Sequence, residues 1–160
     1  NMAFTSTESY INPQPIDETS TTQKLPTGTI IKAKDDSLGV GEFIYLKGVA
    51  STVVGSVVAF DEADVTALAA ANAQGRIGVA MSANVASSFG WYQISGKAHA
   101  KVLSSFADNG SVYLTSTAGS VDDADVAGDS VIGAVGRSAI SGGLAYLELN
   151  RPFVDNIAHD

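Results

Sequence analysis

The chain has 160 residues, no cysteine, two histidines and a formal net charge of −8 at pH 7. This composition excludes disulfides, thiolate chemistry and cysteine-ligated zinc. Nine Lys and Arg residues against 17 Asp and Glu cannot supply the basic surface that phosphate binding requires, and an anionic membrane would repel the chain. We therefore expect neither nucleic acid nor membrane as a partner.

Charged residues are scarce. They make up 16% of the chain, against about 25% in an average soluble domain. A surface that is largely neutral and small suits contact with other protein, although a compact β-protein can have the same composition. No apolar stretch approaches the ~20 residues needed to span a bilayer, and the opening residues lack the basic and apolar regions of a signal peptide. We expect one soluble domain.

Residues 1–26 are predicted to form an extended N-terminal arm. Three of the four prolines lie at positions 13, 15 and 26, where they fix an extended backbone and exclude helix. A disordered terminus is the alternative. Apolar side chains that would anchor a docked arm are Phe4, Tyr10, Ile11 and Ile16.

Residues 27–150 are predicted to form an all-β domain, an antiparallel β-sandwich or barrel-like fold, followed by a C-terminal extension at 151–160. Short runs of β-branched and aromatic residues alternate with Gly, Asp, Asn and Ser, as in antiparallel sheets. The predicted strands lie within 27–34, 42–49, 55–60, 76–82, 90–96, 97–103, 111–117, 130–138 and 144–150.

One segment favours a helix instead. "DEADVTALAAANAQG" (61–75) begins with an Asp suited to an N-cap, has acidic residues in its first turn, and continues through an alanine run to a closing Gly. Helix propensity predicts a short helix over 62–73. An irregular excursion or a strand is the alternative.

The sequence also contains an internal echo. "GSVVAF" (55–60) resembles "GSVYLT" (110–115), and "RIGVAMSA" (76–83) resembles "VIGAVGRSA" (131–139), both at an offset of 55 residues. The pair "GWYQI" (90–94) and "GLAYL" (143–147) has an offset of 53 residues, two fewer than the other pairs. The echo predicts two similar halves, 55–102 and 110–154; chance matching of Gly- and Val-rich strands is the alternative.

No catalytic signature is present, so we do not expect an enzyme. In "KAHAKVL" (97–103), Lys97, His99 and Lys101 share one face of a strand, which indicates a half-exposed structural histidine. His159 lies in a polar tail. Neither a nucleophile motif nor a phosphate-binding loop accompanies them.

No metal or cofactor site is predicted. The acidic run "VDDADVAGD" (121–129) resembles a calcium loop that starts at Asp123, but Ala127 and Ala134 occupy the fifth and twelfth positions, where oxygen ligands belong. A solvated loop is the favoured interpretation. A calcium ion held between subunits at 122–129 is the alternative.

Trp91 and Tyr92 are adjacent in "GWYQISGKAHAKVL" (90–103), which we interpret as a β-hairpin. On a strand the two side chains face opposite sides, so one could be buried and the other exposed as a contact residue. Alternatively, the chain's own loops cover both.

The order of these features resembles head decoration, or cement, proteins of tailed bacteriophages. The resemblance is carried by "LPTGTIIKAKDDSLGVGEFIYLKGVAS" (25–51), above all "GEFIYLKG", by "GRIGVAMSANVASSFGWYQISGKAHAKV" (75–102), and by "VYLTSTAGSVDDADVAGDSVIGAVGRSA" with "LAYLELNRPFV" (within 112–154). It covers nearly all of the chain after the arm. It consists of similar residue types in the strand and turn segments and similar spacing between them, with no catalytic motif.

The resemblance implies a β-domain, trimeric, on the outer surface of the virion capsid, synthesised in the host cytoplasm and bridging subunits of the major capsid protein. The arm and the C-terminal extension would contact the capsid. The residues expected at a capsid or subunit interface are Phe4, Tyr10, Ile11, Ile16, Trp91, Tyr92 and Phe153. Two alternatives remain: a carbohydrate- or receptor-binding module of a phage fibre, which "FGWYQ" could serve, and a small hydrolase.

Overall fold

The structure is a computed structural model that describes residues 4–6 and 13–155. Within these residues it contains only β-strands, loops and turns, so the all-β prediction is confirmed. The strands are β1 (Thr5–Ser6), β2 (Ile30–Asp35), β3 (Gly39–Lys47), β4 (Val57–Phe60), β5 (Thr66–Leu68), β6 (Gly75–Ala80), β7 (Phe89–Lys101), β8 (Ser111–Leu114), β9 (Val121–Asp122), β10 (Ser130–Gly136) and β11 (Leu144–Val154).

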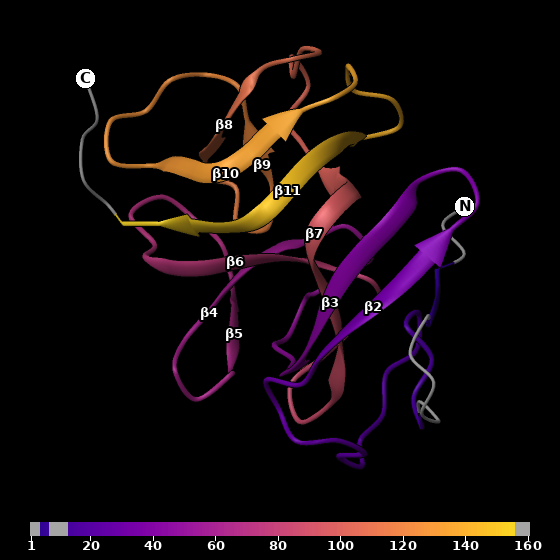
Figure 1. The fold of residues 1–160 in the computed structure, drawn as a ribbon. Helices are drawn as coiled ribbons and strands as arrows, with labels where there is room; N and C mark the ends of the chain where they lie inside the picture. The colour runs from indigo at the N-terminus through magenta and orange to yellow at the C-terminus, as the bar shows by residue number, and fades with distance from the viewer. Residues whose placement is uncertain (1–3, 7–12, 156–160) are drawn as a thin grey trace.

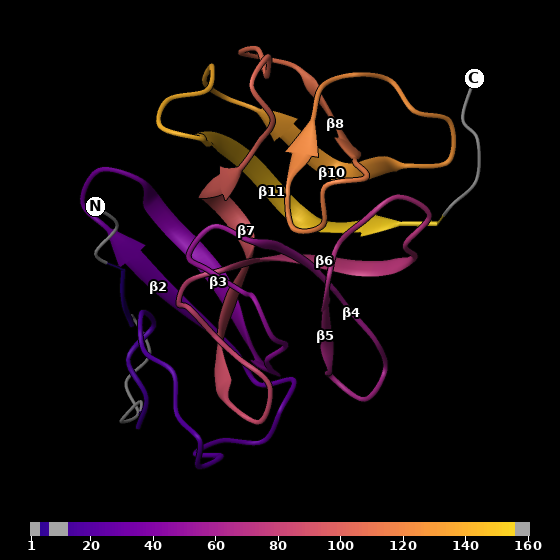
Figure 2. The ribbon, with the colours of Figure 1, turned by 180° about the vertical axis from the view of Figure 1, so that it is seen from behind.

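All strand pairings are antiparallel and give the order β1-β2-β3-β7-β6-β11-β10-β8-β9, with β4 and β5 branching from β6. The sheet does not close into a barrel; it bends so that its parts pack face to face as a sandwich-like fold. In Figure 1, β2 and β3 lie on one side of β7 while β8, β10 and β11 lie on the other. The view from behind shows β4 and β5 beside β6 (Figure 2).

The predicted hairpin at 90–103 is wrong, because β7 is one continuous strand of 13 residues. Its first part pairs with β3, from Phe89 to Ser95, and its second part pairs with β11, from Ser95 to Lys101. Between them Gly96 adopts φ +92°, and a Cβ there would lie 2.6 Å from the carbonyl oxygen of Val40. The glycine therefore changes the direction of the strand instead of reversing it.

The predicted helix at 62–73 is also wrong. Asp61 Oδ1 accepts hydrogen bonds from the backbone of Ala63 and Val65, both at 3.0 Å, so the expected helix cap closes a turn. The chain then forms β5, in which Leu68 pairs with Val58 of β4. Pairing with β4 lets the alanine run continue along the core, where Ala69 is fully buried; tertiary contacts thus override local helix propensity.

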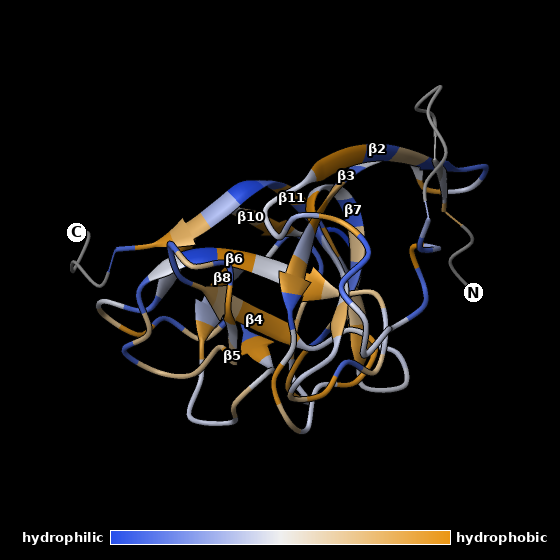
Figure 3. Ribbon diagram, turned by 90° about the horizontal axis from the view of Figure 1, so that it is seen from below, coloured by the Kyte–Doolittle hydropathy of each residue, from blue (hydrophilic) through white to orange (hydrophobic). Residues whose placement is uncertain are grey.

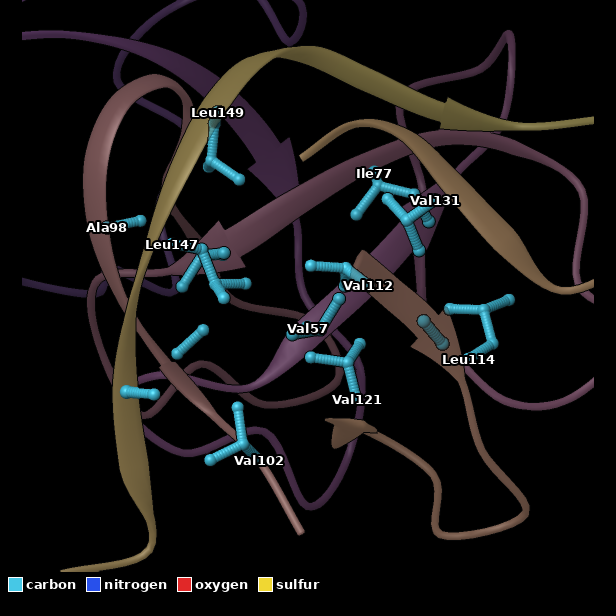
Figure 4. Close-up of a cluster of buried hydrophobic side chains, with 14 of the residues drawn as sticks. Val57, Ile77, Ala98, Val102, Val112, Leu114, Val121, Val131, Leu147 and Leu149 are labelled. Carbon is cyan, nitrogen blue, oxygen red and sulfur yellow. The ribbon is translucent and has the colours of Figure 1, made fainter. Parts of the chain in front are cut away.

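Buried side chains form three clusters. The largest is mainly aliphatic and takes side chains from β4 and from every strand between β6 and β11; Figure 4 shows Leu147, Val112 and Val57 directed toward one another. An aromatic cluster on β3 and β7 contains Phe43, Tyr45 and Trp91. A third cluster lies on the opposite face of β3 and β7 and includes β4, which is apolar along its length (Figure 3).

Candidate interaction surface

The seven residues expected at an interface have different positions in the fold. Ile16, Trp91 and Tyr92 are buried in the chain's own core, so the alternative in which the chain itself covers both aromatic residues of "WY" is the one observed. Phe4 is half-buried against the aromatic cluster, and Phe153 has 42% of its surface exposed. Tyr10 and Ile11 lie outside the described residues.

Residues 13–26 form a strap over the aromatic cluster. Gln14 is its centre: its backbone carbonyl accepts a hydrogen bond from Trp91 Nε1 at 2.9 Å, and its side-chain oxygen accepts one from the Tyr45 hydroxyl. Gln14 Nε2 donates to the Phe89 carbonyl at 2.9 Å. Burial raises the pKa of the Tyr45 phenol, although a hydrogen bond from the Lys24 backbone acts the other way. The strap is thus a docked part of the domain.

An apolar hollow of about 60 Å³ opens where strands from both halves of the chain meet. Its lining comes from β2, β3, β4, β6, β7 and β11. Apart from two arginines all of its lining residues are apolar. They are Ile30, Ile44, Phe60, Ile77, Ile94 and Pro152, with Arg76 and Arg151.

Arg76 lies across from aromatic residues on both neighbouring strands. It pairs with Phe60 of β4, and its guanidinium lies 4.5 Å from the centre of that ring. On its other side it pairs with Phe153 of β11, so both rings and the arginine share one face of the sheet. Among the described residues it forms an ion pair with Asp64 Oδ1 at 3.5 Å. A wider depression of about 730 Å³ continues past Phe60 and Arg76 to Val65.

Arg151 reaches the same hollow from a β-bulge. Between the pairs Ala134–Leu149 and Ile132–Phe153, three residues of β11 face the single residue Gly133. Arg151 has φ +42°, a conformation that residues other than glycine rarely adopt. Bulges of this kind redirect side chains. Here the side chain forms an ion pair with Glu42 at 3.4 Å.

A second surface lies on the outer face of β7 and β11. The His99 ring stacks on Tyr146 with centres 4.6 Å apart, and this partial burial lowers the pKa of the imidazole. Lys97 and Lys101 flank the histidine on the same strand face. His99 therefore has the structural, half-exposed position that the alternating sequence predicted.

The described part of the chain contains no group of three or more His, Asp or Glu side chains able to hold a metal ion. Within the acidic run, Asp129 Oδ1 accepts a hydrogen bond from the Asn72 backbone at 2.7 Å, which ties that loop to the segment before β6. The hollow between Arg76 and Arg151 presents contact chemistry, namely apolar walls with two cations at the rim.

Sequence reasoning missed this hollow and both arginines. Arg76 and Arg151 are 75 positions apart, and only the pairing of β6 with β11 brings them together. The one available signal was "NRPF", in which an arginine and a proline interrupt an alternating strand, as bulges often do.

Comparison of the chain with protein-family models, curated proteins and solved structures finds no match. A search of residues 4–6 and 13–155 finds no helix of a length and hydropathy that would cross a bilayer.

Proposed function

We propose that the protein is a structural virion component that binds the outside of an assembled phage capsid and stabilises it by bridging major capsid protein subunits. The observation that carries the proposal is the contact surface around Arg76. It combines the apolar hollow, which Ile30 lines, with the wider depression, which Val65 lines, and with Phe153 opposite Arg76; these apolar side chains are 38%, 39% and 42% exposed. Apolar patches with a polar rim are typical of protein-binding surfaces.

The stabilising mechanism is thermodynamic. A protein that binds only the assembled lattice adds RT ln(1 + [L]/Kd) per site to the stability of that state, about 2.7 kcal/mol when its concentration is one hundred times Kd. A trimer would engage several subunits at once, and the linked contacts would raise the overall avidity. In this mechanism the capsid contacts come from the surface around Arg76. Residues 13–26 of the arm pack on the chain's own domain.

Light scattering followed by co-sedimentation with purified, undecorated phage heads tests the proposal. We expect a trimer that sediments with the heads and raises the temperature at which they rupture. A monomer that leaves both sedimentation and rupture unchanged would contradict it. The glycan-binding alternative depended on an exposed aromatic residue in "FGWYQ", and Trp91 and Tyr92 are both buried.

A further inference from the structure

The hollow has the size of one aliphatic side chain. One water molecule needs roughly 10–15 Å³ of such volume, so about 60 Å³ accommodates several non-hydrogen atoms. Six of its eight lining residues have apolar side chains. A polar guest would leave its hydrogen-bonding groups unsatisfied against these walls, whereas an aliphatic guest would not.

The two arginines at the rim have weak partners within the chain. Their ion pairs are 3.5 Å and 3.4 Å long, and the arginine side chains are 53% and 57% exposed. Ion pairs with an exposed guanidinium contribute little to stability, and a guanidinium has five N–H donors. Both groups can therefore bind a further carboxylate without losing much.

The position of Arg151 comes with a cost in backbone energy. A residue with a side chain is disfavoured at positive φ and is held there only by the structure around it. In an ordinary alternating strand, without the bulge opposite Gly133, the side chain would have a different direction. The bulge thus places a second cation beside Glu42 at the hollow.

We propose that the hollow binds one aliphatic side chain, Leu, Ile or Val, from a segment of a partner protein that carries a carboxylate next to it. Arg76 and Arg151 bind the carboxylate while the apolar walls enclose the side chain. This inference names the contact chemistry of the surface used in the proposed function, and rests on that function only for the choice of a protein as the partner. The partner's carboxylate shares each arginine with Asp64 or Glu42, so the N–H donors of the two guanidiniums, and not a net positive charge, select the acidic segment.

Titration of the isotopically labelled full-length protein with blocked pentapeptides, followed by amide NMR shifts, tests the inference. The probe peptide has Leu at its centre with Asp and Glu on either side. We expect saturable shifts at Ile30, Arg76 and Arg151. Replacing the central Leu by Ala, or both acidic residues by Lys, should weaken binding at least about tenfold, since each change removes one half of the contact.

Two matched pairs of variants locate the site. Ile30→Trp closes the mouth of the hollow, whereas Val40→Trp adds the same ring at a more exposed position on the adjacent strand. Arg151→Gln removes a rim cation, whereas Arg137→Gln removes an exposed arginine that pairs with Glu148 at 3.1 Å elsewhere. The first member of each pair should weaken peptide binding, and the second should leave it unchanged.

Equal binding of the acidic and basic peptides, shifts away from the hollow, or absence of binding would overturn the inference. The same four variants in the capsid sedimentation assay separate it from the proposed function. If heads bind the protein and Ile30→Trp and Arg151→Gln have no effect, the inference is wrong and the function stands. If peptide binds as expected but heads do not, only the capsid function is wrong.

Discussion

Two four-strand units, β4–β7 and β8–β11, have the same pairing scheme. In each, the first strand pairs with the second and the third, and the third pairs with the fourth. The register also repeats: Val57 faces Val79 in the first unit, and about 55 positions later Ser111 faces Val135 in the second. The strand that precedes each unit, β3 or β7, pairs with that unit's last strand.

The units differ in what fills and covers them. The first packs Trp91 with Tyr45 of β3, ring centres 5.0 Å apart, and needs the strap to cover these rings. The second packs against the aliphatic cluster, to which β4 and β6 of the first unit also contribute and in which Phe106 is the one large ring among the described residues. The comparison teaches that strand order and register survive a change of core composition, provided that another segment covers the extra aromatic surface.

Among the tests of this comparison, removing the tryptophan should change the free energy of unfolding most. Trp91→Ala should lower the free energy of unfolding by about 3–5 kcal/mol, because it leaves a cavity and removes the hydrogen bond to Gln14. Urea denaturation measures the change. Phe153→Ala, at a partly exposed ring, is the control and should cost much less. Similar losses for both variants would contradict the assigned burial.

The bulge can be tested at two glycines that occupy matching positions. Gly133 of β10 has φ +85°, and a Cβ there would lie 2.7 Å from the Asn150 carbonyl oxygen. Gly78 of β6 lies 55 positions earlier, and the nearest atom to its added Cβ would be the Tyr92 Cβ at 3.2 Å. Gly133→Ala should destabilise by roughly 1–3 kcal/mol, and Gly78→Ala by less. Thermal melts compare them, and the reverse order would show that the bulge is absent.

Loss of the Gln14 side chain should weaken the packing of the strap on the domain. Gln14→Ala removes the acceptor of the Tyr45 hydroxyl and the donor to Phe89, so we expect a loss of about 1–3 kcal/mol in stability. Because the chain has one tryptophan, its fluorescence reports on the strap directly. A red shift of the Trp91 emission is expected. Gln23→Ala, at an exposed amide of the same segment, should leave the emission unchanged.

The smallest effect is expected at the junction of the two units, where His99 stacks on Tyr146. Burial lowers the pKa of His99 in the folded state below its usual 6.5, so the unfolded chain binds the proton more readily. Stability should therefore fall as the pH drops below about 6.5 and should not change through this group above it. His99→Gln should flatten that part of the pH profile. Melting temperatures measured between pH 7.5 and 5.5 test this. If their slope against pH is the same with and without His99→Gln, the assigned burial is wrong.

Much of the fold followed from the sequence. Alternating strands, glycine-rich turns and the offset between "GSVVAF" and "GSVYLT" predict an all-β protein with related segments, because a period of two is a local property of the chain. The same local reasoning failed at 62–73, where pairing with β4 outweighs helix propensity. It also failed at Gly96, where a glycine that bends one strand was predicted to be the turn of a hairpin. Neither outcome is encoded by neighbouring residues alone.

The sequence by itself determined the β class and the half-exposed place of His99. Only the tertiary structure decided that Gln14 bonds to both Tyr45 and Trp91, that both residues of "WY" are buried, and that Arg76 and Arg151 meet at one hollow. The physical reason is separation along the chain. Each of these features depends on strand pairs or strap contacts between residues tens of positions apart, and such contacts leave no period in the sequence.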